Sequence, residues 1–152
     1  MKAAFAAGCF WGIEKAFRAV KGVSKVVSGY MGGEMENPSY EEVSSGDTGH
    51  AESVILEYDP KKVSYDKLLD VFWQIHDPTE VNKQGPDVGE QYRSVIFYFD
   101  EEQKKKALAS KKKEQIKYSK PIATQVVKAG KFYKAEEYHQ KYLEKMRKKN
   151  II

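Results

Sequence analysis

The only cysteine of the sequence, Cys9, is the residue with the clearest capacity for covalent chemistry. It lies in Gly8-Cys9-Phe10-Trp11-Gly12 and has no partner for an internal disulfide, so it is either a passive buried thiol or a nucleophile. An apolar run at residues 2–7 predicts a strand, and apolar residues from Ile13 onward recur at helical spacing. Cys9 therefore falls at the first turn of a helix, where unpaired backbone N–H groups and the helix dipole lower a thiol pKa. This position favours the nucleophile.

Two aromatic residues follow the thiol directly. The helical spacing turns Ile13 and Phe17 toward the core and places Glu14, Lys15 and Arg18 on the face away from it. Such a helix cannot bury both Phe10 and Trp11 beside these core residues, so at least one of the two projects near the sulfur. We expect an apolar wall beside Cys9.

Glu52 is the candidate general acid. Residues 51–58 alternate as a strand, and Glu52 shares the parity of Val54, Leu56 and Tyr58. If that face is the core side, desolvation raises the carboxyl pKa and leaves a neutral acid that can donate a proton. The alternative is a glutamate at the end of a strand, exposed to water, and the pattern alone leaves both open.

Three further polar residues lie in two long segments without clear periodicity, residues 34–48 and 77–93. They are Tyr40, Asp87 and Tyr92. A loop as long as 77–93 inside a compact domain is usually functional. The residues themselves carry little weight, because loop tyrosines are usually packing or surface residues.

Composition excludes several classes of function. The net charge of +4 comes mainly from lysines interleaved with glutamates, which are typical of solvated helix faces, and arginine occurs only three times, so nucleic-acid binding is not expected. His50, His76 and His139 lack the paired spacing of metal ligands, and no glycine-rich phosphate loop is present. No apolar run approaches the roughly 18 residues of a membrane helix. One cysteine and no signal-like segment indicate a reducing, cytoplasmic location.

The order of elements predicts a ferredoxin-like α/β (α+β) sandwich of two layers. Up to residue 99 the pattern is strand, helix, strand, loop, strand, helix and strand, which is a split βαβ arrangement. Asp100 and Gln103 then open a helix that we expect to end near Tyr118. A strand at 122–127 and a helix from about Ala135 complete a helix-strand-helix extension. At this length we expect a single domain, residues 1–152.

Several collinear segments resemble the A-type peptide methionine sulfoxide reductases. The cysteine segment resembles that family's nucleophile motif, and the match runs in order from residue 3 to about 143. Gly29-Tyr30-Met31-Gly32-Gly33 also follows the family, except that Met31 stands where threonine is more typical. The other matching segments are Thr48-Gly49-His50-Ala51-Glu52, Ile75-His76-Asp77-Pro78-Thr79, Gln84-Gly85-Pro86-Asp87-Val88-Gly89-Glu90-Gln91-Tyr92-Arg93-Ser94 and Ala135-Glu136-Glu137-Tyr138-His139-Gln140.

The resemblance implies reduction of methionine S-sulfoxide, free or in oxidised proteins, with no bound cofactor. By position, Cys9 attacks the sulfoxide sulfur and Glu52 protonates its oxygen, helped by hydrogen bonds from Tyr40 and Tyr92. The resemblance also implies that Phe10 and Trp11 hold the substrate methyl group, and that Asp87 orients the polar side of the pocket. Cys9 is left as a sulfenic acid.

The sequence departs from the family in one respect, because many members carry resolving cysteines near the C-terminus and this chain has only Cys9. We therefore expect an external thiol to regenerate it, either thioredoxin or glutaredoxin with glutathione. We expect a monomer.

Two other classes remain open from the residues. A thiol peroxidase also forms a sulfenic acid but needs an arginine near the thiolate, for which only Arg18 and Arg93 are available. A basic binding module with a structural cysteine is the non-enzyme alternative.

Overall fold

The computed structural model describes residues 1–148. Its core follows the predicted order of two strand-helix-strand units. The elements of this core are β1 (Lys2–Ala7), α1 (Phe10–Arg18), β2 (Val23–Met31), β3 (Ala51–Tyr58), α3 (Tyr65–Gln74) and β6 (Ser94–Tyr98).

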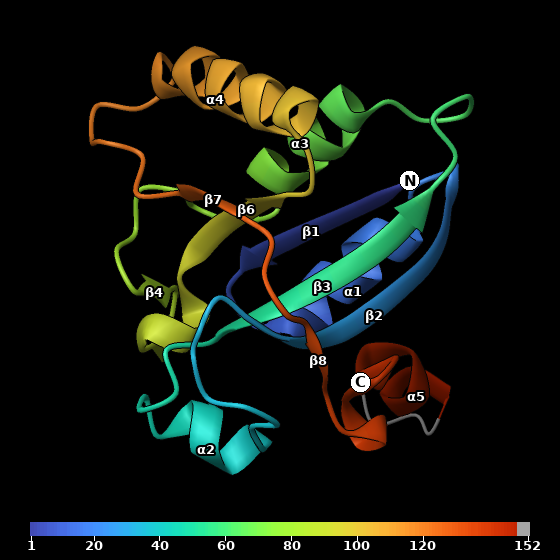
Figure 1. Ribbon diagram of the computed structural model, residues 1–152, viewed down its shortest axis with the longest axis vertical. Coiled ribbons are helices and arrows are strands. Elements are labelled where there is room, and N and C mark those ends of the chain that lie inside the picture. The colour runs from blue at the N-terminus through green and yellow to red at the C-terminus, as the bar shows by residue number, and fades with distance from the viewer. Residues whose placement is uncertain (149–152) are drawn as a thin grey trace.

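The core strands form an antiparallel sheet in the order β6-β1-β3-β2. β3 therefore lies between β1 and β2, the strands that α1 connects, which is the split βαβ arrangement (Figure 1). Within residues 1–148 the sheet has six strands, because β7 (Gln125–Lys128) pairs parallel with β6 and β8 (Tyr133–Lys134) pairs with β2. The predicted ferredoxin-like α/β fold is confirmed.

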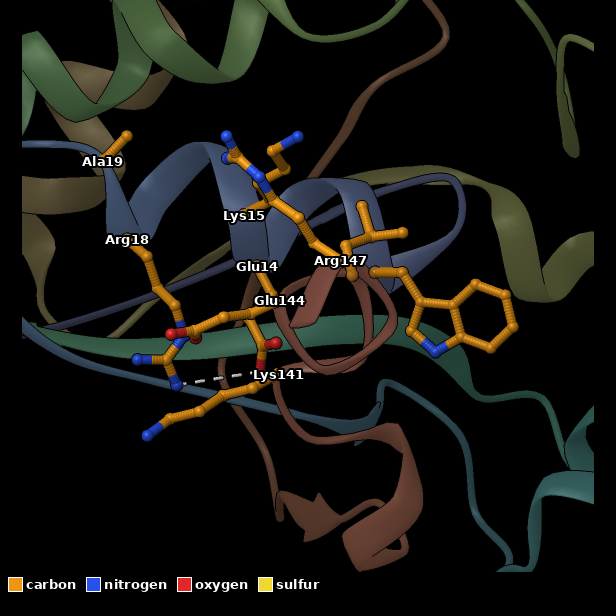
Figure 2. Close-up of a pocket in the computed structure, with 9 residues that line it drawn as sticks. Glu14, Lys15, Arg18, Ala19, Lys141, Glu144 and Arg147 are labelled. Carbon is orange, nitrogen blue, oxygen red and sulfur yellow. Dashed lines mark ion pairs between the residues drawn. The ribbon is translucent and has the colours of Figure 1, made fainter. Parts of the chain in front are cut away.

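The C-terminal extension contains the expected helix, strand and helix, but their bounds differ from those predicted. α4 (Glu101–Gln115) begins after Asp100, whose side chain accepts a hydrogen bond from the Gln103 N–H as predicted, but it ends three residues before Tyr118. The last helix is present but begins later than the expected Ala135, because a 3-10 turn, η2 (Glu137–His139), precedes α5 (Tyr142–Lys148). α5 packs against α1, and a groove lies between them (Figure 2).

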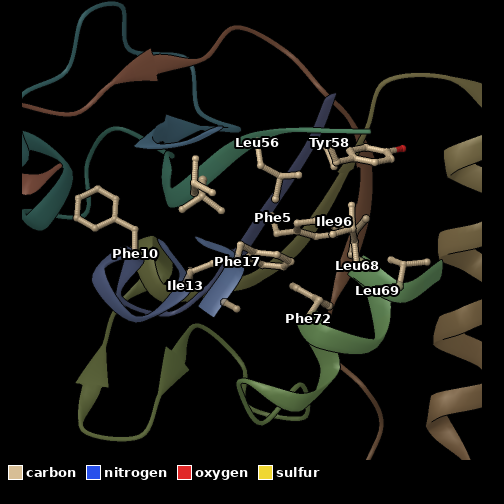
Figure 3. Packing of buried hydrophobic residues seen from close by; sticks show 14 of the residues in the cluster. Phe5, Phe10, Ile13, Phe17, Leu56, Tyr58, Leu68, Leu69, Phe72 and Ile96 are labelled. Carbon is tan, nitrogen blue, oxygen red and sulfur yellow. The ribbon is translucent and has the colours of Figure 1, made fainter. Parts of the chain in front are cut away.

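The main hydrophobic core lies between the sheet and the helices α1 and α3 (Figure 3). Phe5 of β1 is central: its ring stacks on Phe17 of α1 at 5.0 Å between centroids and lies 5.3 Å from Phe72 of α3. The opposite face carries a smaller hydrophobic cluster, to which β1 contributes Ala4 and Ala6. The segment between β7 and β8 crosses that face, which buries β1 on both sides (Figure 1).

The two segments expected to be loops contain short ordered elements. Residues 34–48 include a helix of five residues, α2 (Tyr40–Ser44), which Ser39 and Glu42 stabilise with a capping box. Residues 77–93 include the strands β4 (Lys83–Gln84) and β5 (Asp87–Val88) and a 3-10 turn, η1 (Glu90–Tyr92). The sequence does not predict these helices, strands and turns, because each is too short to show a periodic pattern.

Glu14 corrects a second expectation. Its side chain is buried rather than turned to solvent, with 2% of its surface exposed. It accepts a hydrogen bond from Ser28 Oγ at 3.2 Å and lies 3.8 Å from Arg18 Nη2. The C-terminal segment covers this side of α1, and helical spacing alone does not reveal such long-range packing.

Candidate active site

A sharp turn between β1 and α1 places Cys9. Gly8 has a φ of 95°, a left-handed conformation that favours glycine, and a Cβ there would lie 2.9 Å from the Gln84 side chain. Cys9 then occupies the N-cap position, with Phe10 as the first helical residue. The backbone N–H groups of Trp11 and Gly12 lie close enough to its sulfur to lower the thiol pKa, although neither donates a hydrogen bond to it. Cys9 thus lies at a helix start, as predicted, and its side chain is half-buried.

Glu52 lies beneath the same turn. It sits on the core face of β3, opposite Tyr30 of β2, and only 1% of its surface is exposed. Its Oε1 accepts a hydrogen bond from the Phe10 N–H at 3.2 Å, whereas its buried Oε2 has no partner within residues 1–148. Burial raises the pKa of Glu52 to about 7, and the charge of Asp87 acts in the same direction. Of the two alternatives that the sequence left open, the buried carboxyl is the one found.

The pKa of the Cys9 thiol is raised, whereas the position at a helix start predicts that it is lowered. Burial raises its pKa to about 12, and the negative charges of Glu52 and Asp87 raise it further, although the N–H groups of Trp11 and Gly12 lower it. The helix terminus therefore acts as predicted, but the desolvation that accompanies tertiary packing outweighs it. With its pKa near 12, the thiol stays protonated at neutral pH.

The two tyrosines reach the same place from different segments. Tyr40 begins α2, and Tyr92 ends η1. The two phenols lie near each other and near Glu52. Burial raises both pKa values, and the charge of Glu52 is the next largest cause for each. Both hydroxyls therefore remain protonated and can donate hydrogen bonds near Cys9 and Glu52.

Asp87 also belongs to this cluster. It lies on β5 in the 77–93 segment, and its charge raises the pKa values of Cys9, Glu52 and Tyr92. All five of the predicted polar residues, Cys9, Tyr40, Glu52, Asp87 and Tyr92, therefore influence one another electrostatically.

The aromatic pair divides between two surroundings. Phe10 is fully buried, 5.7 Å from the Tyr30 ring and 5.1 Å from the His139 ring. Trp11 is half-buried, and its indole stacks on Tyr142 with 3.7 Å between centroids. Both aromatic residues follow the cysteine turn directly, and Phe10 is the one that packs in the hydrophobic core.

Two residues of the C-terminal segment form hydrogen bonds with residues of the site, and the sequence predicts no role for either of them. His139 Nδ1 accepts a hydrogen bond from Trp11 Nε1 at 3.0 Å. Glu136 accepts one hydrogen bond from the Tyr30 hydroxyl at 2.8 Å and another from the Tyr40 backbone N–H at 3.0 Å. The only sequence feature that could have identified these two residues is the family resemblance of the segment Ala135–Gln140, and that resemblance does not indicate what their side chains contact.

The arginine that a thiol peroxidase needs is engaged elsewhere. Arg18 Nη2 donates to the Val26 carbonyl at 2.7 Å. Arg93 donates to the carbonyls of Gly49 at 2.9 Å and Glu90 at 3.0 Å. Within residues 1–148, no cluster of histidine, cysteine, aspartate and glutamate side chains could hold a metal ion. The same part of the chain contains no helix with the length and apolarity needed to cross a membrane.

Comparison with known proteins gives one consistent family. The family model described as peptide methionine sulfoxide reductase matches residues 1–152. The chain is 62% identical to the peptide methionine sulfoxide reductase MsrA of Methanosarcina acetivorans over 146 residues, which cover 95% of this chain and 78% of the relative. It is 59% identical to the MsrA of Methanothermobacter thermautotrophicus, covering 95% and 86%.

Solved structures agree. Reduced Mxr1 from Saccharomyces cerevisiae superposes with a TM-score of 0.91 and 39% identity, covering 95% of this chain and 84% of Mxr1. Mxr1 in complex with Trx2 gives a TM-score of 0.68 and 28% identity, covering 93% and 84%.

Proposed function

The chain belongs to the peptide methionine sulfoxide reductase family and is an oxidoreductase, a peptide-methionine (S)-S-oxide reductase, and from that premise we propose how its own residues carry out the reduction. The proposal is that Cys9 is the nucleophile, Glu52 the general acid, and Tyr40 and Tyr92 the donors that hold the sulfoxide oxygen. The observation that carries it is the buried Glu52, whose Oε2 has no partner within residues 1–148.

The raised pKa values of Cys9 and Glu52 suggest how a single proton serves the reaction. With the thiol protonated, an ionised Glu52 can take up the thiol proton when a substrate is present. A bound sulfoxide favours this transfer, because its sulfur is the positive end of the S=O dipole and stabilises the thiolate. The same proton then passes from Glu52 to the sulfoxide oxygen.

The proposed step conserves atoms and electrons. Cys9 Sγ attacks the sulfoxide sulfur, Glu52 protonates the oxygen, and the oxygen is transferred to Sγ as methionine leaves. The substrate sulfur gains two electrons and becomes a thioether. The cysteine sulfur loses two and becomes a sulfenic acid that carries the proton.

We propose that Phe10 and Trp11 contact the substrate methyl group. Trp11 is the better placed of the two, because its ring is half-exposed while Phe10 is fully buried. Asp87 would keep the opposite side of the pocket polar. The hydrogen bond between Trp11 and His139 and the stacking on Tyr142 fix the indole for this contact.

We propose that an external thiol completes the cycle, since Cys9 is the only cysteine of the 152 residues. The thiol condenses with the sulfenic acid to form a mixed disulfide and water, and a second thiol releases Cys9. The complex of Mxr1 with Trx2 supports thioredoxin as the reductant, and glutaredoxin with glutathione is the alternative. Organisation as one domain over residues 1–152, a monomeric state and a cytoplasmic location stay predictions.

The test is turnover on resolved sulfoxide epimers with three reductants in parallel: dithiothreitol, thioredoxin, and glutaredoxin plus glutathione. Free methionine sulfoxide and an oxidised peptide are both supplied. We expect methionine from the S-epimer alone, with at least one protein reductant supporting repeated turnover. Stoichiometric methionine release followed by arrest with every protein thiol would contradict external regeneration.

A further inference from the structure

The groove between α1 and the C-terminal segment is not used in the proposed reaction. Its volume is about 690 Å³ (Figure 2). The residues that line it come from α1 and its end (Trp11, Glu14, Lys15, Arg18 and Ala19) and from the C-terminal segment (Lys141, Leu143, Glu144 and Arg147). Cys9 is not among its lining residues. The groove nevertheless begins at Trp11, two residues beyond the nucleophile, so a ligand bound there can continue into the active site.

The lining is cationic. Four of its side chains are basic: Lys15 and Arg18 from α1, and Lys141 and Arg147 from the C-terminal segment. Two are acidic, Glu14 and Glu144, so the groove keeps two net positive charges even with both ionised. A cleft lined by one sign of charge concentrates ligands of the opposite sign.

Arg18 offers a donor that no other residue within 1–148 uses. Its Nη2 donates to the Val26 carbonyl and lies 3.8 Å from Glu14. Its Nε is buried and has no partner within residues 1–148. Glu14 does not satisfy it: that carboxyl accepts from the Ser28 hydroxyl and lies near Nη2, and no hydrogen bond joins it to Nε. An unused guanidinium donor in a cationic groove is suited to a carboxylate.

The spacing along α1 limits where such a carboxylate would sit. Trp11 and Arg18 are seven residues apart on the helix, which is about 10 Å at roughly 1.5 Å per residue. An extended polypeptide covers that distance in about three residues, at roughly 3.3 Å each. Building on the proposed function, we propose that the groove binds an acidic side chain of the oxidised polypeptide, about three residues from the methionine sulfoxide. The enzyme then prefers acidic segments over neutral or basic ones.

The experiment uses capped alanine heptapeptides with a central methionine S-sulfoxide. Glu, Gln or Lys is placed at the third position before or after the sulfoxide, and dithiothreitol is the reductant, so that no protein partner contributes. The readout is the ratio of kcat/KM for the Glu and Gln peptides. We expect about a three- to tenfold preference for Glu at one of the two positions at low ionic strength, the size of one or two ion pairs, and a loss of most of it at high salt.

Matched variants locate the effect. K15Q/R147Q removes two groove charges, and K105Q/K112Q removes two exposed charges from α4. The Glu preference should fall toward one in the first variant and persist in the second. A ratio near one for both peptide positions, or an equal loss in both variants, would overturn the proposal. A capped methionine sulfoxide without flanking residues is assayed alongside, and its turnover tests the reductase function separately.

Discussion

Two buried glutamates lie at α1, Glu14 within the helix and Glu52 beneath its first residue, and they differ in how their oxygens are satisfied. Glu14 and Glu52 are both nearly inaccessible, with 2% and 1% of their surfaces exposed, and burial raises both pKa values. Glu14 is held by Ser28, by the Lys141 backbone and by Arg18. Glu52 has a single N–H donor and a bare Oε2 within residues 1–148.

The difference separates a structural carboxyl from a chemical one. A buried polar group without a partner costs stability, so such a group persists where function needs it. Glu14 connects α1 to β2 through Ser28, and neither of its oxygens is both buried and without a partner within residues 1–148. Glu52 retains a free oxygen that a substrate can meet.

The largest expected effect comes from removing the Cys9 thiol, the proposed nucleophile. In C9S, we expect methionine formation to fall at least about 10⁴-fold, because a hydroxyl cannot form the sulfenic acid and is a weak nucleophile. Single-turnover methionine release on a resolved S-sulfoxide measures this. Thermal unfolding should match the wild type, which confirms that the loss is chemical. Retained turnover would remove Cys9 from its role.

The two glutamates should then separate in opposite directions. E52Q should slow single-turnover methionine release by about 10²–10⁴-fold, because an amide can hydrogen-bond the oxygen but cannot protonate it. Its effect should stay below that of C9S. E14Q should leave the rate within about threefold and instead lower the free energy of unfolding by about 1–2 kcal/mol, since hydrogen bonds to a buried charge are lost. Rates and urea unfolding are measured on both variants, and equal rate losses would contradict the distinction.

The sequence predicts the position of Glu52 but not the burial of Glu14. Strand parity places Glu52 beside Val54 and Leu56, and that parity depends only on local backbone geometry. Helical spacing places Glu14 on the outer face, and it is buried because Lys141, far along the chain, covers it. Local periodicity therefore identifies the faces that the sheet and its helices share, and does not identify those that a later segment covers.

The thiol of Cys9 illustrates the same limit. The helix start that lowers its pKa is predicted by the residues on either side of Cys9 in the sequence. The burial that raises the pKa to about 12 depends on the folded surroundings. The contact of Trp11 with His139 joins residues 128 positions apart. Long-range contacts of this kind leave no spacing signal, which explains why His139 and Glu136 were not predicted as supports of the site.

A smaller effect, on stability, should depend on pH. The pKa of Glu52 lies near 4.5 when unfolded and about 7 when folded, so the folded state binds its proton more tightly. Its contribution to stability is complete below pH 4.5 and is lost as the pH rises through 7. The loss amounts to about 3 kcal/mol. E52Q removes this contribution.

The measurement is urea unfolding of wild type and E52Q between pH 4 and 8. The difference between the two proteins is the quantity of interest. His76 also titrates in this range, because burial lowers its pKa to about 4, and its contribution cancels in the difference. The wild type should lose stability relative to E52Q as the pH rises. Parallel curves would show that Glu52 is not desolvated.

The smallest effects concern the hydroxyls near each glutamate. Tyr40 and Tyr92 lie near Glu52 without a hydrogen bond to it within residues 1–148, whereas the Ser28 hydroxyl donates directly to Glu14 at 3.2 Å. Y40F and Y92F should each slow single-turnover methionine release about tenfold, because each phenol donates to the sulfoxide oxygen only as charge develops on it. S28A is the matched removal of a hydroxyl beside a buried carboxyl. It should reduce the free energy of unfolding by about 1 kcal/mol with little change in rate. If S28A slowed the reaction as much as the tyrosine variants, a free oxygen would not distinguish the catalytic glutamate from the structural one.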